Sequence, residues 1–213
     1  MSLFHIDGII YINLLHRKDR QVRLLEELAS IDIDKQKIFW IEAVYDILNG
    51  HRGCVQSHIK ALELAIEKKW TNVLILEDDV MFVKDKHFID QIIQKFFFVF
   101  EKNWDVFFLG AAVFDAVALD DHRFKKVLCA ECAHSYIVNQ DYYLVLIDCF
   151  TKALDLMKDD GDFVDSTFKA LDQRWKQLQQ KDRWFIGPIM TQQRRSYSDI
   201  DHLIKDRAHQ DYF

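Results

Sequence analysis

Three consecutive carboxylates, Glu77, Asp78 and Asp79, directly follow an apolar segment at residues 73–76. Three adjacent negative charges repel one another, and only bulk water or a bound cation relieves that repulsion at low cost. Carboxylate oxygens are ligands that suit Mg²⁺ and Mn²⁺, and such ions can bridge a protein to substrate phosphates. The triplet therefore predicts either a divalent-metal site or a solvated acidic turn.

A second segment with the chemistry of a ligand site lies at residues 13–20 (NLLHRKDR), after the first apolar run of the chain. It carries Arg17, Lys18 and Arg20, and backbone N–H groups at the start of a helix would add affinity for phosphate oxygens. Arg17 and Arg20 are therefore candidate ligands of a nucleotide diphosphate. The alternative is a cationic first helical turn that pairs with Asp19.

Three more polar segments follow apolar runs. Residues 53–58 (GCVQSH) begin a predicted helix, and His58 either faces a ligand or is a structural histidine. Residues 40–44 (WIEAV) end another apolar run, and Ala43 either forms the floor of a base pocket or packs in the core. Residues 192–200 (QQRRSYSDI) predict a loop over the site, with a flexible basic tail as the alternative.

The elements that position these residues follow from the apolar pattern. Short continuous apolar runs predict buried strands, and apolar residues repeated every three or four positions predict helices. Strands are expected at residues 8–13, 38–44, 73–76, 105–112, 135–139 and 184–189, and helices at 18–31, 54–69, 88–101, 141–157 and 164–180. This alternation predicts an α/β fold with a mainly parallel sheet covered by helices on both faces. In such sheets, ligands bind outside the carboxyl ends of the strands, which is where residues 77–79 lie.

Composition narrows the class of protein. Half of the 213 residues are apolar, which excludes a disordered chain, and the net charge of −6 argues against a protein that grips nucleic acid. With one proline, six glycines and no linker-like segment, residues 1–213 are expected to form one domain, either alone or within a longer protein. We find neither a signal-peptide pattern nor an apolar run of about 18 residues, so we expect no membrane span and a cytoplasmic location.

The four cysteines are expected to be ordinary reduced thiols. Cys129 and Cys132 have the spacing of a zinc or redox motif, but no second pair of ligands follows, and the motif leads into a predicted strand rather than a helix.

Taken in order, these segments resemble the motifs of glycosyltransferase family 25, which includes bacterial lipooligosaccharide galactosyltransferases and procollagen galactosyltransferases. The matching motifs are I-N-L-x-x-R-x-D-R at residues 12–20, A-V at 43–44, G-C-x-x-S-H at 53–58, L-E-D-D-V at 76–80, D-x-x-x-L-G at 105–110, Y-I-V at 136–138 and a final S-D-I at 198–200. His16 departs from the family pattern, and the segment between residues 44 and 53 is short. Residues 171–178 and 196–200 resemble the collagen-type and giant-virus members most closely.

The resemblance implies a GT-A-like (Rossmann-like) fold, a UDP-sugar donor, a Mn²⁺ or Mg²⁺ ion and inversion at the anomeric carbon. It implies that Glu77 and Asp79 bind the metal, with Asp79 part of the catalytic machinery. It further implies that the nucleotide sugar is contacted by Asn13, Arg17, Arg20, Ala43, His58, Glu77 and Asp78. The reaction would move a hexose to an acceptor hydroxyl, either on the hydroxylysine of a collagen-like protein or on a glycan. A viral member would act in the host-cell cytoplasm.

Inversion by single displacement also requires a base that takes the acceptor proton. We expect Asp172 to be this base, with Asp165 in reserve. The alternative for Asp172 is a surface carboxylate paired with a lysine or arginine. Asp199 and residues 192–193 are expected to lie near the acceptor.

Two other functions compete with glycosyl transfer. A metal-dependent nucleotidyltransferase would also need acidic residues, but no glycine-rich phosphate loop is present. A catalytically inactive module that binds a nucleotide sugar or a glycan is disfavoured by the intact residues 77–79. Release of UDP from a UDP-sugar in the presence of metal would separate an enzyme from a binding module.

Overall fold

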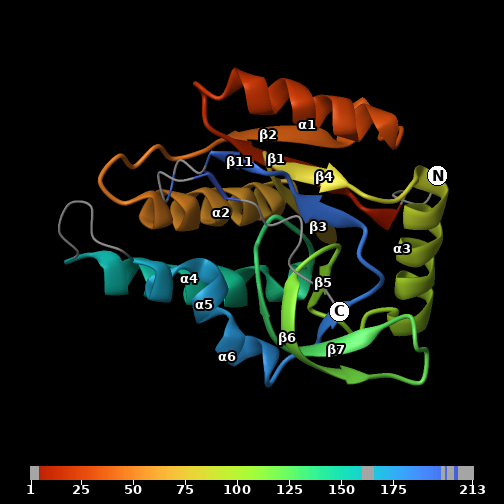
Figure 1. Cartoon of the computed structure of the whole chain (residues 1–213). Coiled ribbons are helices and arrows are strands. Elements are labelled where there is room, and N and C mark those ends of the chain that lie inside the picture. Colours follow the sequence, from red (N-terminus) through yellow and green to blue (C-terminus); the bar gives the residue numbers. More distant parts are fainter. Residues whose placement is uncertain (1–4, 160–165, 198–199, 201–203, 206–213) are drawn as a thin grey trace.

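The computed structural model describes residues 5–159, 166–197, 200 and 204–205. In this part of the chain, the central sheet has eight strands in the order β2-β1-β3-β8-β5-β9-β7-β6. Figure 1 shows the sheet between its helices. They are β1 (Gly8–Asn13), β2 (Ile38–Glu42), β3 (Asn72–Glu77), β5 (Val106–Phe108), β6 (Ala112–Ala118), β7 (Lys125–Glu131), β8 (Ser135–Asn139) and β9 (Trp184–Ile186). From these pairings, β7 and β8 are antiparallel to the other six strands of this sheet, which all point in one direction. The prediction of a mainly parallel sheet is therefore confirmed.

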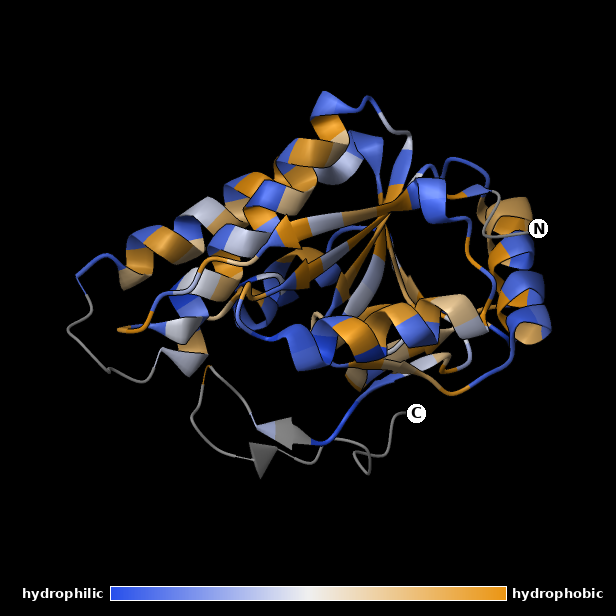
Figure 2. Cartoon of the chain, turned by 90° about the horizontal axis from the view of Figure 1, so that it is seen from above, coloured by the Kyte–Doolittle hydropathy of each residue, from blue (hydrophilic) through white to orange (hydrophobic). Residues whose placement is uncertain are grey.

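Helices cover both faces of the sheet. The four long ones are α1 (Lys18–Ser30), α2 (Gly50–Glu67), α3 (Lys86–Phe100) and α4 (Tyr143–Met157). Apolar residues of α2 and α4 pack in one core cluster with Ile10 and Ile75, and those of α1 and α3 pack in a second cluster with Ile9 and Leu74. Because successive strand residues point to opposite faces, the two clusters are the two sides of the sheet. Figure 2 shows hydrophobic residues along the strands and striped along the helices.

Strand register brings the polar ends of three strands together. In the parallel pairs, Asn13 lies beside Glu42, and Ile12 lies beside Glu77. The segments that follow β1, β2 and β3 therefore meet at one edge of the sheet, as the sequence predicted. None of the helices in the described ranges is long and apolar enough to cross a membrane.

The predicted long helix at residues 164–180 is wrong. Where the structure describes this segment, from residue 166, it forms three short pieces: η4 (Thr167–Lys169), α5 (Leu171–Arg174) and α6 (Lys176–Gln179). Ala170 has an extended backbone between the first two pieces, and Phe168 is 85% exposed although Leu171 and Trp175 are buried. The indole of Trp175 donates a hydrogen bond to the carbonyl oxygen of Ala130 at the end of β7, so tertiary packing overrides the helical spacing.

Three predicted strands are too long. The second ends at Glu42 rather than residue 44, and the predicted strand at 105–112 ends at Phe108. Beyond this strand, a Cβ at Gly110 would lie 2.2 Å from the carbonyl oxygen of Thr191, so the close approach of the two backbones requires a glycine. The last strand ends at Ile186, shortly before Pro188, which has no N–H to extend a ladder.

Several short strands were not predicted. Strands β6 and β7 form an antiparallel pair at the sheet edge. Strands β4 (Val80–Phe82) and β10 (Thr191–Gln193) form a separate two-stranded ribbon, and β11 (Ser196–Tyr197) pairs with β12 (Ile204–Lys205). Residues 192–200, expected as a loop, thus begin in a strand. The remaining short helices are η2 (Lys35–Lys37) and η3 (Gln140–Tyr142).

Candidate active site

A cavity of about 300 Å³ opens at the carboxyl edge of β1, β2 and β3. Its walls come from these strand ends, from α2, from α5 and from β10. Of the residues predicted as metal ligands, as donor contacts or as the preferred base, Arg17 alone is not part of the lining. The others, which line the cavity, are Asn13, Arg20, Ala43, His58, Glu77, Asp78, Asp79 and Asp172. Asp165 and Asp199 lie outside the described residues.

The loop after β2 is held in place by the start of α2. Asn49 caps this helix by accepting a hydrogen bond from the backbone N–H of Arg52. A Cβ at Gly53 would lie 2.5 Å from the carbonyl oxygen of Val44, so the helix packs this closely because residue 53 is a glycine. The Ser57 hydroxyl accepts from the Val44 N–H at 2.8 Å and donates to the Gly53 carbonyl at 2.7 Å. Two residues of the G-C-x-x-S-H motif therefore position the wall that includes Ala43.

Asp78 turns toward β1 and α1. Its carboxylate accepts hydrogen bonds from Asn13 Nδ2 and from the Arg20 guanidinium, each at 2.7 Å. The side chains of Arg20 and Asp78 are only 11% and 9% exposed, and Arg20 also donates to the carbonyl oxygen of Tyr197. Burial raises the pKa of Asp78, while the positive charge of Arg20 acts in the opposite direction. The middle carboxylate is thus neutralised by a partner from within the chain.

Arg17 lies outside the cavity. Its guanidinium pairs with Asp19 through Nε at 3.1 Å and through a terminal nitrogen at 3.2 Å. This hydrogen bond lowers the pKa of the Asp19 carboxyl. The pairing is the alternative that the sequence left open, and of the two candidate arginines only Arg20 reaches the cavity.

Asp79 and Glu77 turn toward β10 rather than toward Arg20. The side-chain amide nitrogen of Gln193 lies 3.4 Å from Glu77 Oε2 and 3.5 Å from both carboxylate oxygens of Asp79. This arrangement follows from the ribbon, in which Gln193 pairs with Val80. Burial, together with the charges of Glu77 and Asp78, raises the pKa of Asp79 to about 7. Negative charge therefore accumulates on this side of the triplet.

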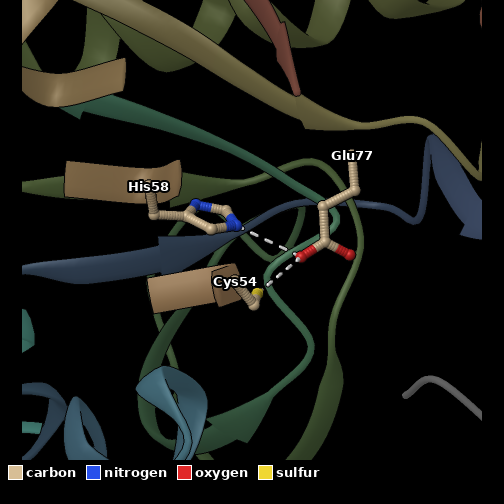
Figure 3. Close-up of side chains that lie close together, drawn as sticks. All are labelled: Cys54, His58 and Glu77. Atoms are coloured by element: carbon tan, nitrogen blue, oxygen red, sulfur yellow. Dashed lines mark hydrogen bonds and ion pairs between the residues drawn. The ribbon is translucent and has the colours of Figure 1, made fainter. Parts of the chain in front are cut away.

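Cys54, His58 and Glu77 converge at the inner wall of the cavity (Figure 3). Glu77 Oε1 lies 3.2 Å from His58 Nε2 and 3.9 Å from Cys54 Sγ, and the three ligand atoms are all within 4.8 Å of one another, close enough to hold a metal ion. Burial raises the pKa of the Cys54 thiol, and the negative charge of Glu77 adds to this. Sequence reasoning missed Cys54, although its spacing of four residues from His58 placed both on one face of a helix.

Asp172 reaches the cavity from α5. Its Oδ2 accepts a hydrogen bond from the backbone N–H of Cys132 at 3.1 Å, and the side chain is half-buried. Cys132 has a positive φ of 74°, which is uncommon for a residue other than glycine. Asp172 lines the same cavity as the acidic triplet, and its role as the base stays a prediction. All four cysteines are free thiols.

The fold and the site together have the features of an α/β enzyme with its ligand site at the carboxyl edge of a mainly parallel sheet: an acidic cluster and a buried arginine surround a cavity there. The sequence model of glycosyltransferase family 25 (LPS biosynthesis protein) matches residues 23–160, which is more than half of the chain. The chain belongs to this glycosyltransferase family. The match includes Cys54, His58 and residues 77–79, whereas Asn13, Arg20 and Asp172 lie outside it.

Solved structures resemble the chain only distantly. Mannose-1-phosphate geranyltransferase from Thermus thermophilus is 8% identical, with 94% of this chain and 77% of that chain covered and a TM-score of 0.48. A glycosyltransferase involved in glycosylation of the major capsid of PBCV-1 is 14% identical (84% and 92% covered, TM-score 0.43). A UDP-glucose pyrophosphorylase complexed with UDP-glucose is 6% identical (88% and 92% covered, TM-score 0.46). No curated protein sequence matches the chain.

Proposed function

We propose that this family 25 glycosyltransferase moves a hexose from a UDP-sugar to an acceptor hydroxyl, with inversion and with the help of a hard divalent cation. The observation that supports this most is the crowding of Glu77 and Asp79 at the cavity wall, with the Asp79 pKa raised to about 7. We treat residues 1–213 as one glycosyltransferase domain.

Glu77 and Asp79 are suited to hold the cation. Both carboxylates lie 3.4–3.5 Å from the neutral amide nitrogen of Gln193, and Glu77 also contacts His58 Nε2 at 3.2 Å. Their hard oxygen atoms match the ligand preference of Mn²⁺ and Mg²⁺. When bound, such an ion supplies Lewis-acid stabilisation of the leaving diphosphate.

Arg20 is our candidate for the donor side. Asp78 and the Tyr197 carbonyl hold its guanidinium at the cavity wall, so little side-chain entropy remains to be lost when a diphosphate binds. Asn13 fixes the other oxygen of Asp78, and Ala43 would contact the nucleoside. Arg17 is not part of this proposal because its guanidinium pairs with Asp19.

Asp172 is our candidate for the base that takes the acceptor proton. It comes from a different element than the triplet yet lines the same cavity, and the Cys132 N–H fixes one of its oxygens. A carboxylate positioned in this way can accept a proton as the acceptor oxygen attacks the anomeric carbon.

The acceptor we propose is the hydroxylysine of a collagen-like protein, with a glycan as the second candidate. The resemblance of residues 171–178 to collagen-type members supports it, and the net charge of −6 is compatible with a basic peptide. A glycan acceptor is supported by the bacterial branch of the family.

The experiment is a panel of UDP-sugars with Mn²⁺, in which released UDP is measured and acceptors are analysed by mass spectrometry. We expect one donor to release UDP and to add a hexose mass to a hydroxylysine-containing Gly-X-Y peptide. Extension of an oligosaccharide alone would reject the collagen acceptor and keep the transferase. Donor binding without UDP release from any donor would indicate a binding module instead. Asp79→Asn serves as the inactive control.

A further inference from the structure

The cluster of Cys54, His58 and Glu77 adds two ligands, a thiol and an imidazole, that the proposed hard-cation site does not use. It presents one thiol, one imidazole and one carboxylate on the wall of the cavity (Figure 3). Soft thiolate and imidazole ligands favour Zn²⁺ over Mg²⁺ or Mn²⁺. The chemistry of this wall therefore differs from that of the carboxylate pair Glu77 and Asp79.

The distances are close to those of a tetrahedral zinc site. With Zn–S near 2.3 Å and Zn–N and Zn–O near 2.0 Å, ligand atoms of such a site lie about 3.3–3.6 Å apart. Glu77 Oε1 is 3.2 Å from His58 Nε2 and 3.9 Å from Cys54 Sγ. A shift of a few tenths of an ångström would bring the thiol into range of the Glu77 carboxylate, and the distance between Cys54 Sγ and His58 Nε2, which is within 4.8 Å, would have to shorten to about 3.5 Å.

The imidazole is already oriented for this role. His58 is fully buried, and its Nδ1 lies 2.7 Å from the hydroxyl of Tyr136, with the two rings stacked. A tyrosine hydroxyl can donate to Nδ1 or accept from it. Without a metal, a proton on Nε2 makes the contact with Glu77 a hydrogen bond. A bound cation would take the place of this proton, and a Tyr136 hydroxyl that accepts from Nδ1 would then fix the tautomer that metal-binding histidines require.

We propose that Cys54, His58 and Glu77 form a binding site for Zn²⁺ or another thiophilic divalent cation, with a fourth position open to the cavity. Binding releases the thiol proton of Cys54 to solvent, and the thiolate and the Glu77 carboxylate together balance the charge of the dication. Because Glu77 is shared, this site excludes the use of Glu77 by the hard cation. This last consequence, unlike the site itself, rests on the proposed function.

The first test uses Co²⁺, which gives a near-ultraviolet charge-transfer band only when a thiolate binds it. We expect one equivalent of Co²⁺ to produce this band in the wild type, and Zn²⁺ to displace it. Cys54→Ser should lose the band, while the matched control Cys129→Ser, a free cysteine on β7 outside the cavity lining, should keep it. No band in the wild type, or a band that survives Cys54→Ser, would overturn the site.

A second measurement needs no substitution. Zn²⁺ should protect Cys54 of the wild-type protein from alkylation, while labelling of Cys129 stays the same; equal labelling of Cys54 with and without Zn²⁺ would overturn the proposal. Tyr136→Phe tests the orientation of His58, because loss of such an outer hydrogen bond weakens metal affinity by about 10–100-fold. We expect the Cys54→Ser loss of Zn²⁺ affinity to exceed that of Tyr136→Phe, and the reverse order would count against direct ligation.

The activity arm measures Zn²⁺ inhibition of Mn²⁺-supported UDP release, with each variant normalised to its own rate without zinc. Cys54→Ser should require at least about 100-fold more Zn²⁺ for half inhibition, consistent with loss of a direct ligand. Equal Zn²⁺ inhibition of the wild type and of Cys54→Ser would overturn the proposal that Zn²⁺ and Mn²⁺ compete for Glu77. Absence of UDP release from any donor would reject the proposed function, while the Co²⁺ band and the alkylation pattern would still decide the zinc site.

Discussion

The two sides of the acidic triplet differ in how their charge is balanced. On one side, Asp78 is buried and paired with Arg20 and Asn13, so its charge is neutralised within the chain. On the other side, Glu77 and Asp79 share the neutral amide of Gln193, and the pKa of Asp79 rises to about 7. Neighbours in sequence thus have opposite electrostatic situations. From this comparison we infer that Asp78 holds the site together, whereas Asp79 and Glu77, which also contacts His58, are the candidates for binding a ligand.

Asp79→Asn should have the largest effect on turnover. The amide keeps the shape of the side chain but removes the charge that we expect to hold the cation, so the rate should fall by more than about 100-fold, beyond the loss caused by outer partners of a metal site. UDP release with saturating Mn²⁺ measures this. Turnover within a few-fold of wild type would place the metal elsewhere.

Asp78→Ala should act on stability instead. It would leave Arg20 as a buried charge without its carboxylate partner, which typically costs about 3–5 kcal/mol. Denaturant unfolding at pH 7 gives the change in the free energy of unfolding. The double variant Asp78→Ala with Arg20→Met is the matched control, because removal of both charges should recover part of the loss; no recovery would argue against the ion pair as the cause.

Without metal, Asp79→Asn should be more stable than the wild type at neutral pH. The folded-state pKa of Asp79 is about 7 and its ordinary value is 3.8, so the folded state holds this proton more tightly and loses stability as pH rises from about 4 to 7. The asparagine variant lacks this dependence. We expect a gain of about 2–4 kcal/mol at pH 7 that vanishes near pH 4, measured by thermal unfolding in EDTA. A difference that does not change with pH would contradict the raised pKa.

Arg17→Ala should have the smallest effect. Its guanidinium pairs with the half-exposed Asp19 and is not part of the cavity lining, so its loss should leave UDP binding almost unchanged. Calorimetry with UDP should give an affinity close to that of the wild type, whereas Arg20→Ala should weaken it by about 1.5–3 kcal/mol if the contact is direct. Equal losses of UDP affinity in Arg17→Ala and Arg20→Ala would show that Arg17 contributes to UDP binding.

Much of this arrangement could be predicted from the sequence because it is local. The continuous apolar runs of β1 and β3 fixed the strands, and the polar residues directly after them had to meet at one edge. The different partners of Asp78 and Asp79 could not be predicted, because they depend on which of the two carboxylates faces α1 and which faces β10. Both partners come from distant segments, 58 residues away for Arg20 and 114 for Gln193.

The failures have different physical causes. Residues 166–180 have helical spacing, but the fit of Trp175 against β7 and of Asp172 against the Cys132 N–H breaks the segment into short pieces. The β4–β10 ribbon is three residues long on each side, too short to leave a periodic signal. Cys54 is different, because its spacing from His58 was visible in the sequence. Its place in the cavity was missed because we interpreted it as an ordinary thiol.

The β4–β10 ribbon joins an early and a late segment of the chain, so the site is complete only after residues 191–193 have been synthesised. Residues 77–79 are synthesised long before Gln193 and Arg194. In the folded protein, the backbone N–H of Arg194 donates a hydrogen bond to the carbonyl oxygen of Asp79 at 2.7 Å. The pairing of β4 with β10 must close a long loop, and such long-range pairings form slowly. The amide between Glu77 and Asp79 is added only when the late segment docks, so a chain released before residue 190 would carry the acidic edge without the strand that completes it.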